Sequence, residues 1–268
     1  MDKTFLKWAG GKNWFISHEQ HRLPAQYHRY IDPFLGGGSL YFFLEPPIAI
    51  INDINRELTT TFSAIRDDWQ RVERALVVHS RRHSQEYYYQ IRAMRPRTPA
   101  TIAARMIYLN RTCFNGIYRV NRSGGFNVPI GTHNNVILNT DNFEQRSAIL
   151  QNAQIFCQDF EEIIDMAEAE DFLFCDPPYS VQDENNRFVN YTAQLFNWND
   201  QVRLAQSLHR AKDRNVKIIM TNVNHPAVRA LYENVEGYYL ADVNRYSSIS
   251  GLARGRQQYN ELIVSANI

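Results

Sequence analysis

The tetrapeptide Asp176-Pro177-Pro178-Tyr179 combines the residue types best suited to hold a planar ring that carries an amino group. It directly follows the apolar run Phe172–Cys175, which is typical of a buried strand. Two prolines fix the backbone and donate no amide hydrogen, so the local carbonyls stay available as acceptors. A carboxylate and a carbonyl can then accept two amine hydrogens, and the tyrosine ring offers a stacking face. We predict that Asp176, Pro177 and Tyr179 are catalytic; a purely structural turn is the alternative.

A glycine-rich segment follows an earlier predicted strand. Asp32–Ser39 reads Asp-Pro-Phe-Leu-Gly-Gly-Gly-Ser and comes directly after Tyr30-Ile31. Glycines at the carboxyl end of a strand let a ligand approach the backbone, and Asp53, after the next apolar run, can accept from both hydroxyls of a ribose. The dinucleotide fingerprint would need glycine where Tyr41 stands. The pair therefore indicates another adenosine-containing cofactor, with an ordinary tight turn as the alternative.

The N-terminal segment Lys7-Trp8-Ala9-Gly10-Gly11-Lys12 places an aromatic ring and a cation around a flexible turn. A phosphate-binding loop would need glycine at position 6 and serine or threonine at position 13, where the chain has Leu6 and Asn13. The sequence thus excludes that loop. Trp8 is suited to pack on a ring and Lys12 to pair with a carboxylate; an N-terminal arm that packs on the core is the alternative.

The elements that must position these motifs follow an α/β pattern. The 268 residues suit one large domain, or a core with a second small domain. Short apolar runs alternate with amphipathic stretches over residues 1–55 and about 137–268, which predicts a doubly wound, mainly parallel sheet. Asn197, with Asp200 three residues later, predicts a helix start. The expected strands are 30–31, 48–51, 154–157, 172–175, 216–220 and 262–264.

Residues 56–136 interrupt this alternation. Their periodicity predicts helices at about 56–66, 69–79, 84–94 and 99–113, and Thr98-Pro99 is a good start for the last of them. Residues 117–131 carry Gly124-Gly125 between two short apolar stretches, which is typical of a hairpin or a glycine-rich loop. We therefore expect a helical insertion within the α/β core.

The net charge of +1 hides a strong asymmetry. Residues 71–122 contain eleven arginines and two acids, whereas residues 141–200 contain thirteen acids and two arginines. Arginine binds phosphate and guanine in bidentate fashion. The basic segment thus favours a localised surface for a polyanion, with a solvated helical face as the alternative.

Other features narrow the class of protein. The longest apolar runs are too short to span a bilayer, and we see no signal peptide. The three cysteines Cys113, Cys157 and Cys175 do not form a CxxC pair, which fits a reducing cytoplasm and argues against a zinc site. We expect a cytoplasmic protein with no membrane and no metal.

Together the motifs resemble the Dam-type DNA adenine-N6 methyltransferases, a D12-class family with the alpha-group order of motifs. The order is the same: cofactor motifs, then target recognition, then catalysis. The matching segments cover nearly the whole chain and are Lys7–Lys12, Asp32–Gly38, Asn52–Asn55, Asn110–Gly116, Phe126–Pro129 and Asp176–Tyr179.

The resemblance implies a Rossmann-like methyltransferase sheet, S-adenosylmethionine as cofactor and double-stranded DNA as substrate. Residues 1–55 and 137–268 would form the catalytic domain, and residues 56–136, with a hairpin at about 117–131, the target-recognition domain. The family's cofactor site maps onto Trp8, Lys12, Asp32, Phe34, Gly36, Gly38, Asp53, Asp159, Phe160 and Asp176. Its DNA contacts map onto Arg119, Asn121, Arg122, Ser123 and Asn127.

This resemblance implies methyl transfer to N6 of an adenine flipped out of the duplex, in a prokaryotic cell or a phage-infected host. GATC is the implied default site, and Val120 stands where the family usually has tyrosine, which bears on the recognition sequence rather than on the chemistry. Cytosine-N4 methylation and a catalytically silent DNA-binding module are the alternatives. Asp176 favours adenine over cytosine, where serine is commoner, and over protein glutamine methylation, where asparagine is usual. A companion restriction endonuclease is a candidate partner.

Overall fold

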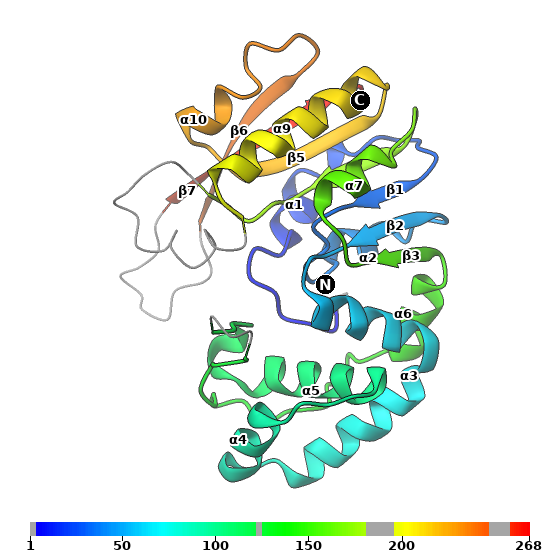
Figure 1. The fold of residues 1–268 in the computed structure, drawn as a ribbon, viewed down its shortest axis with the longest axis vertical. Coiled ribbons are helices and arrows are strands. Elements are labelled where there is room, and N and C mark those ends of the chain that lie inside the picture. Colours follow the sequence, from blue (N-terminus) through cyan, green and yellow to red (C-terminus); the bar gives the residue numbers. More distant parts are fainter. Residues whose placement is uncertain (1–3, 122–124, 181–195, 247–257) are drawn as a thin grey trace. The chain divides into compact units, whose positions relative to one another are not determined.

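The computed structural model describes residues 4–121, 125–180, 196–246 and 258–268 (Figure 1). The chain forms two compact units, which we call the first and the second unit. The first unit is Met1–His21 with Leu35–Cys157, and the second is Arg22–Phe34 with Gln158–Ile268. The predicted recognition domain, 56–136, falls within the first unit by sequence, and its boundaries stay a prediction.

The first unit is mainly helical and carries two parallel strands. Ala49 lies opposite Ala153 and Asn52 opposite Phe156, so the two strands run in register over four residues. The elements of this unit are α1 (Asn13–His18), α2 (Ser39–Leu44), β2 (Ala49–Asn52), α3 (Arg56–Arg82), α4 (Gln85–Ala93), α5 (Pro99–Thr112), α6 (Phe143–Leu150) and β3 (Ala153–Phe156), with short 3-10 turns at Gln20–Arg22 and Phe114–Gly116.

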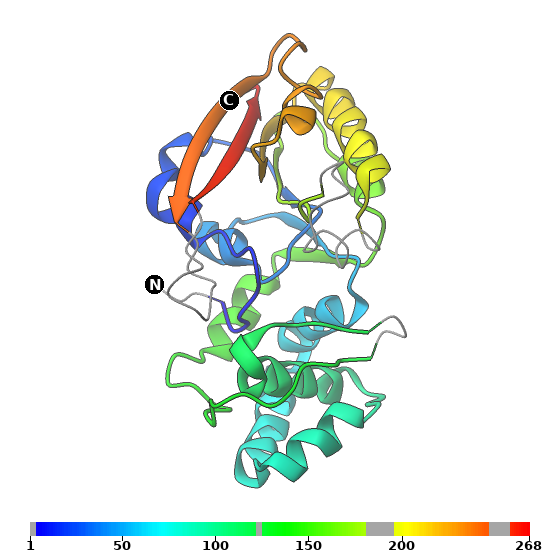
Figure 2. The same cartoon turned by 90° about the vertical axis from the view of Figure 1, so that its left-hand side faces the viewer.

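Helix α3 unites two helices that the sequence predicts separately. Its 27 residues are continuous except at Asp68, whose φ of −158° and ψ of 62° bend the helix between the two predicted halves. Helix α5 begins as predicted: Thr98 accepts from the backbone of Thr101 in a capping box, and Pro99 occupies the first turn. The two helices pack side by side in both views (Figures 1 and 2).

A cluster of phenylalanines holds the N-terminal segment against this helical layer. The ring of Phe5 lies 5.2 to 6.0 Å from those of Phe42, Phe62 and Phe143. Such aromatic pairs add to the free energy of burial. The chain is therefore anchored at Phe5, three residues before Trp8.

The second unit contains three parallel strands and an antiparallel pair. β1 (Tyr30–Asp32) and β5 (Lys217–Val223) each run parallel to β4 (Phe172–Cys175). β7 (Gln258–Ala266) is antiparallel to β5 and to β6 (Tyr239–Tyr246). The described residues of this unit form the helices α7 (Phe160–Asp165), α9 (Trp198–Asp213) and α10 (Pro226–Arg229).

The strand order is β3-β2-β1-β4-β5-β7-β6, a mostly parallel sheet of seven strands. Every residue of β1, β2 and β4 is buried, as expected of strands covered on both faces. The predicted α/β fold with a mainly parallel sheet is confirmed. The predicted start of α9 is confirmed as well, because Asn197 and Asp200 form a capping box.

Candidate functional site

The glycine loop and Asp53 form one hydrogen-bonded unit in the first unit of the chain. Gly36 N donates to Oδ2 of Asp53 at 3.0 Å, and Asn55 N donates to Oδ1 at 2.9 Å. Gly36 and Gly38 have φ of +52° and +70°, in the left-handed region that favours glycine. Both carboxylate oxygens of Asp53 are therefore oriented directly beyond β2, where a diol could donate to them.

Asp53 is partly buried, and this burial governs its electrostatics. Loss of solvent raises the pKa of Asp53 from 3.8 to about 6, although the amides of Asn55 and Gly36 oppose the shift. A ligand that donates hydrogen bonds would favour the charged form. Asp53 therefore has the features of a binding carboxylate.

Trp8 packs directly on the glycine loop. A Cβ built on Gly36 would lie 2.8 Å from Cδ1 of Trp8, and one on Gly37 would lie 2.9 Å from its Cβ. The indole also stacks on Tyr118, with the ring centroids 5.3 Å apart and the planes 26° apart. Any side chain at 36 or 37 would displace Trp8. Glycine at both positions therefore lets the indole of Trp8 lie directly against the backbone of the loop.

Lys12 is buried beside the same loop. Its Nζ donates to Gly10 O at 3.0 Å, and its backbone N donates to Oγ of Ser39, the first residue of α2. The turn 8–12 is thus bonded to the residue that follows the glycines.

Residues on both sides of the predicted hairpin are paired in the described part of the chain. Val120 and Phe126 form an antiparallel bridge, and Asn127 N donates to Arg119 O at 3.1 Å. The side chains of Arg119 and Asn127 also meet, through Nε and Oδ1 at 2.9 Å, whereas Oδ1 of Asn121 accepts from the amide of Gly125. Arg119 and Asn121 are exposed. Arg122 and Ser123 lie outside the described residues.

Tyr118 anchors the base of this hairpin and was not predicted from the sequence. Its hydroxyl donates to Oε2 of Glu57 at 2.8 Å, and Oε1 of Glu57 accepts from Arg105 at 2.7 Å. Burial, together with the charge of Glu57, raises the pKa of Tyr118. The ring that stacks on Trp8 is therefore fixed at both ends.

Two of the eleven arginines of the basic segment are buried and serve the fold. Arg111 forms a bidentate pair with Asp141 at 2.6 Å, and both side chains are at least nine-tenths buried. Arg105 donates to the carbonyls of Ile91 and Arg92 as well as to Glu57. The polyanion surface expected from the charge count is accordingly smaller than the count suggests. Exposed members are Arg71, Arg74, Arg81, Arg82, Arg95, Arg97 and Arg119.

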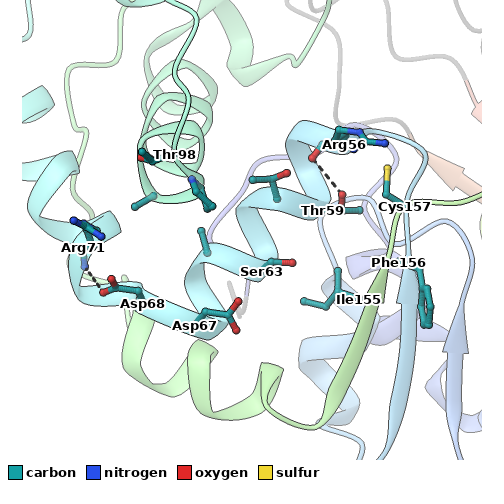
Figure 3. Close-up of a pocket in the computed structure, with 14 residues that line it drawn as sticks. Arg56, Thr59, Ser63, Asp67, Asp68, Arg71, Thr98, Ile155, Phe156 and Cys157 are labelled. Carbon is teal, nitrogen blue, oxygen red and sulfur yellow. Dashed lines mark hydrogen bonds between the residues drawn. The ribbon is translucent and has the colours of Figure 1, made fainter.

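A pocket of about 460 Å³ lies elsewhere in the first unit (Figure 3). It is bordered by the first half of α3, the start of α5 and the end of β3. The labelled residues include Arg56, Thr59, Asp67 and Cys157. It contains none of the predicted cofactor residues, so it does not define the candidate site.

In the second unit, Asp32 and Phe34 form the turn after β1. Asp32 is buried and accepts from the hydroxyl of Tyr30 at 2.9 Å and from the amide of Phe34 at 3.0 Å. The ring of Phe34 lies 5.4 Å from that of Phe160 and 5.7 Å from that of Phe196. The structure thus brings together Phe34 and Phe160, two of the predicted cofactor residues.

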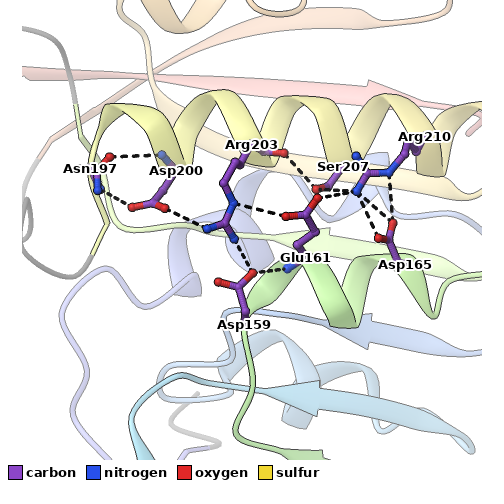
Figure 4. A network of polar contacts seen from close by, with 8 residues as sticks. All are labelled: Asp159, Glu161, Asp165, Asn197, Asp200, Arg203, Ser207 and Arg210. Carbon is purple, nitrogen blue, oxygen red and sulfur yellow. Dashed lines mark hydrogen bonds and ion pairs between the residues drawn. The ribbon is translucent and has the colours of Figure 1, made fainter.

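Asp159 caps α7 and is held by α9 (Figure 4). Its Oδ1 accepts from the amide of Glu161 at 3.0 Å and from Nη2 of Arg203 at 2.5 Å. The guanidinium of Arg203 also lies 4.7 Å from the centroid of the Phe160 ring. One cation therefore contacts both residues of the predicted pair Asp159–Phe160.

The motif Asp176–Tyr179 comes directly after β4. Oγ1 of Thr221, on the neighbouring strand β5, donates to Oδ1 of Asp176 at 2.9 Å. The hydroxyl of Tyr179 donates to Oε2 of Glu261, a buried residue of β7. Pro177 is buried between the two. The motif is thus fixed at both ends, which orients one carboxylate and one ring.

Thr221, Glu261 and Arg203 were missed by sequence reasoning. No short motif marks them, because their roles follow from strand register. Cys175 pairs with Met220 in the sheet, which brings Asp176 beside Thr221.

The described residues meet the requirements of neither a metal site nor a membrane-spanning helix. No group of three or more His, Cys, Asp or Glu side chains there is arranged to hold a metal ion. None of the described helices has the length and apolar character needed to cross a bilayer.

Comparisons with known proteins agree on one family. Residues 8–247 match the family described as D12 class N6 adenine-specific DNA methyltransferase. Type II methyltransferase M1.LlaDCHI of Lactococcus lactis subsp. cremoris is 33% identical over 98% of this chain and 95% of its own length. Type II methyltransferase M.MjaIII of Methanocaldococcus jannaschii is 35% identical over 82% of this chain and 84% of its own. A DNA adenine methylase of Vibrio cholerae is 29% identical over 97% and 95%.

These matches span both units and include every motif on which the predicted site depends. A methyl donor of the S-adenosylmethionine type follows from the family. The chain belongs to the D12 class N6 adenine-specific DNA methyltransferases.

Proposed function

We propose that this enzyme transfers a methyl group from S-adenosylmethionine to N6 of an adenine flipped out of double-stranded DNA, at a specific sequence. The observation that carries the proposal is the fixed Asp176–Tyr179 motif, with its carboxylate held by Thr221 and its ring tied to Glu261. The names of relatives, type II methyltransferase and DNA adenine methylase, support a DNA substrate. The type II names also support a companion restriction endonuclease.

The cofactor residues divide by chemistry. S-adenosylmethionine, when bound, supplies an electrophilic methyl group on a sulfonium. Asp53 accepts from the ribose hydroxyls, and the backbone at Gly36 and Gly38 lines the methionine part. Asp159 and Phe160 flank the adenine. The remaining assigned residues are Trp8, Lys12, Asp32, Phe34 and Asp176.

The reacting amine is a poor nucleophile because its lone pair is delocalised into the purine ring. Asp176 and the carbonyl of Pro177 accept its two hydrogens, which favours a pyramidal nitrogen with its lone pair toward the methyl group. The carboxylate of Asp176 also stabilises the positive charge that develops on N6 until one of the two amine protons leaves. Tyr179 stacks on the flipped base, so orientation and fixed charges supply most of the rate enhancement.

DNA recognition is assigned to the basic part of the first unit. Exposed arginines of α3 and the segment after α4 contact phosphates, and the hairpin contacts bases. The hairpin residues are Arg119, Asn121, Arg122, Ser123 and Asn127. Arginine can take both acceptors of guanine and asparagine both groups of adenine. The recognition site is proposed to contain adenine, with GATC, the site that the family resemblance implies, as the first candidate.

The test is methyl transfer in single turnovers, followed by mass spectrometry of the nucleosides. Wild-type protein should produce N6-methyladenine in duplex DNA, and Asp176→Asn should lose at least about a hundredfold in rate while staying folded. Glu162→Gln, which changes an exposed acid of α7, is the matched control and should keep the wild-type rate. N4-methylcytosine, or DNA binding without any methyl transfer, would refute the proposal.

A further inference from the structure

Arg203 of α9 sits at the centre of a polar network outside the catalytic motif (Figure 4). Nη2 donates to Asp159 at 2.5 Å, Nε to Glu161 at 3.3 Å and Nη1 to Asp200 at 3.4 Å. Its guanidinium plane also lies over the ring of Phe160 at 4.7 Å. Each of the three guanidinium nitrogens thus donates to a different carboxylate, which holds the guanidinium in one orientation.

We propose that Arg203 is a positioning residue that sets the specificity of the cofactor site for the 6-amino group of adenine. The inference rests on the proposed function, because it takes Asp159 and Phe160 as the residues that flank the cofactor's base. Arg203 contacts the charged group of one and the ring of the other. It therefore controls both the acceptor and the stacking face.

The hydrogen bonds at Asp159 are asymmetric. Oδ1 accepts both from the amide of Glu161 and from Arg203. Within the described part of the chain, no hydrogen bond is found at Oδ2. An ionised carboxylate only accepts hydrogen bonds, so Oδ2 matches an exocyclic amine and repels a carbonyl oxygen. Because Arg203 holds Oδ1 of Asp159, it fixes the orientation of Oδ2 toward the base of the cofactor. The site therefore prefers a base with an amino group at this position.

This role differs from stabilisation of the fold. The side chains of Arg203 and Asp159 are 39% and 42% exposed, and pairs so exposed contribute little to stability. Removing Arg203 should therefore leave the melting temperature nearly unchanged while it frees Asp159 and Phe160 to move. If Arg203 only stabilised the fold, its removal would lower the melting temperature and leave the preference for the 6-amino group unchanged.

The same helix offers a matched control. Arg210 lies seven residues later and donates to Glu161 and Asp165, with 44% of its side chain exposed. It has a similar exposure and shares one partner, Glu161, with Arg203. Among the described residues, it contacts neither Asp159 nor the ring of Phe160.

The experiment measures equilibrium binding by calorimetry with two probes, S-adenosylhomocysteine and its 6-oxo analogue S-inosylhomocysteine. Wild-type protein should prefer the 6-amino probe. Arg203→Ala should weaken binding of that probe about tenfold and narrow the preference, since one charge-assisted contact is lost. Arg203→Lys keeps the charge without the planar fork and should fall between the two. Arg210→Ala should match wild type.

Activity and stability complete the test. With saturating S-adenosylmethionine, Arg203→Ala should keep its kcat and show the defect in KM. Should Arg203→Ala fail to fold, Arg203→Lys carries the same comparison. Equal weakening by Arg203→Ala and Arg210→Ala, or an unchanged 6-amino preference in Arg203→Ala, would overturn this inference alone. Failure of the wild-type protein to bind S-adenosylhomocysteine would overturn the proposed function as well.

Discussion

Binding of the methyl donor should depend on pH through Asp53. Burial raises the pKa of this carboxyl to about 6 in the protein without ligand. Ribose hydroxyls donate hydrogen bonds, so they bind the charged carboxylate and not the protonated acid. Lowering the pH through 6 should therefore weaken binding, because ligand and proton compete for the same group.

The size of the effect follows from that pKa. One proton must be lost before the ligand binds, so the apparent Kd should rise about twofold at pH 6 and about elevenfold at pH 5, relative to pH 8. The amino acid part of the ligand does not titrate between pH 5 and about 7. The change of the apparent Kd with pH between 5 and 7 therefore reflects the protonation of Asp53.

Calorimetry with S-adenosylhomocysteine at pH 5, 6, 7 and 8 makes the measurement. Asp53→Asn is the matched control: it should bind more weakly at every pH and show no slope between pH 5 and 7. A wild-type Kd that stays flat across this window would refute the role of Asp53, as would a slope that persists in Asp53→Asn.

The same pKa predicts how folding stability depends on pH. The folded state holds this proton more tightly than the unfolded chain, so wild type should lose stability relative to Asp53→Asn as the pH rises from about 4 to about 6. Two pKa units correspond to at most about 3 kcal/mol, and partial exposure of Asp53 reduces this. Urea denaturation of both proteins measures the difference, and a difference of the opposite sign would contradict the burial argument.

The other predictions concern catalysis, recognition and folding. Tyr179→Phe should keep most of the single-turnover rate and lose about 1–3 kcal/mol of stability with its bond to Glu261, whereas Tyr179→Ala should lose the rate; equal inactivity would show that the hydroxyl matters. Arg119→Ala and Asn121→Ala should each relax one position in a randomised duplex pool, and unchanged preferences would exclude the hairpin as the reader. Arg111→Met should cost about 3–5 kcal/mol in urea denaturation, and adding Asp141→Leu should restore much of it.

Features that depend on neighbouring residues could be predicted from the sequence. The caps at Thr98 and Asn197 are local, since a side chain bonds to the backbone three residues later. The buried strands β1, β2 and β4 stand out because they are short apolar runs between polar ones. Asp53 and Asp176 are local features too, as each directly follows such a strand.

The strand β6 was not predicted, although the short apolar run Tyr238–Ala241 overlaps its start. Tyr239 is 73% exposed, and each residue from Leu240 to Asn244 is either partly buried or exposed. Its weak burial fits its place at the end of the strand order, where it pairs with β7. Similarly, the partners Thr221 and Glu261 depend on register across β4, β5 and β7, which a motif search does not encode.

The arginine content of the chain illustrates how composition and structure differ as evidence. The eleven arginines and two acids of residues 71–122 suggest a localised surface that binds a polyanion. Arg105 instead pairs with the partly buried Glu57, and Arg111 pairs with the buried side chain of Asp141. Arg105 thereby holds the acid to which Tyr118 is bonded. Substitution of Arg105 by an uncharged residue would alter DNA recognition by loosening Tyr118 at the base of the hairpin, and not by removing a phosphate contact. Loss of Arg105 should therefore change sequence preference while the dependence on salt, which counts phosphate contacts, stays the same.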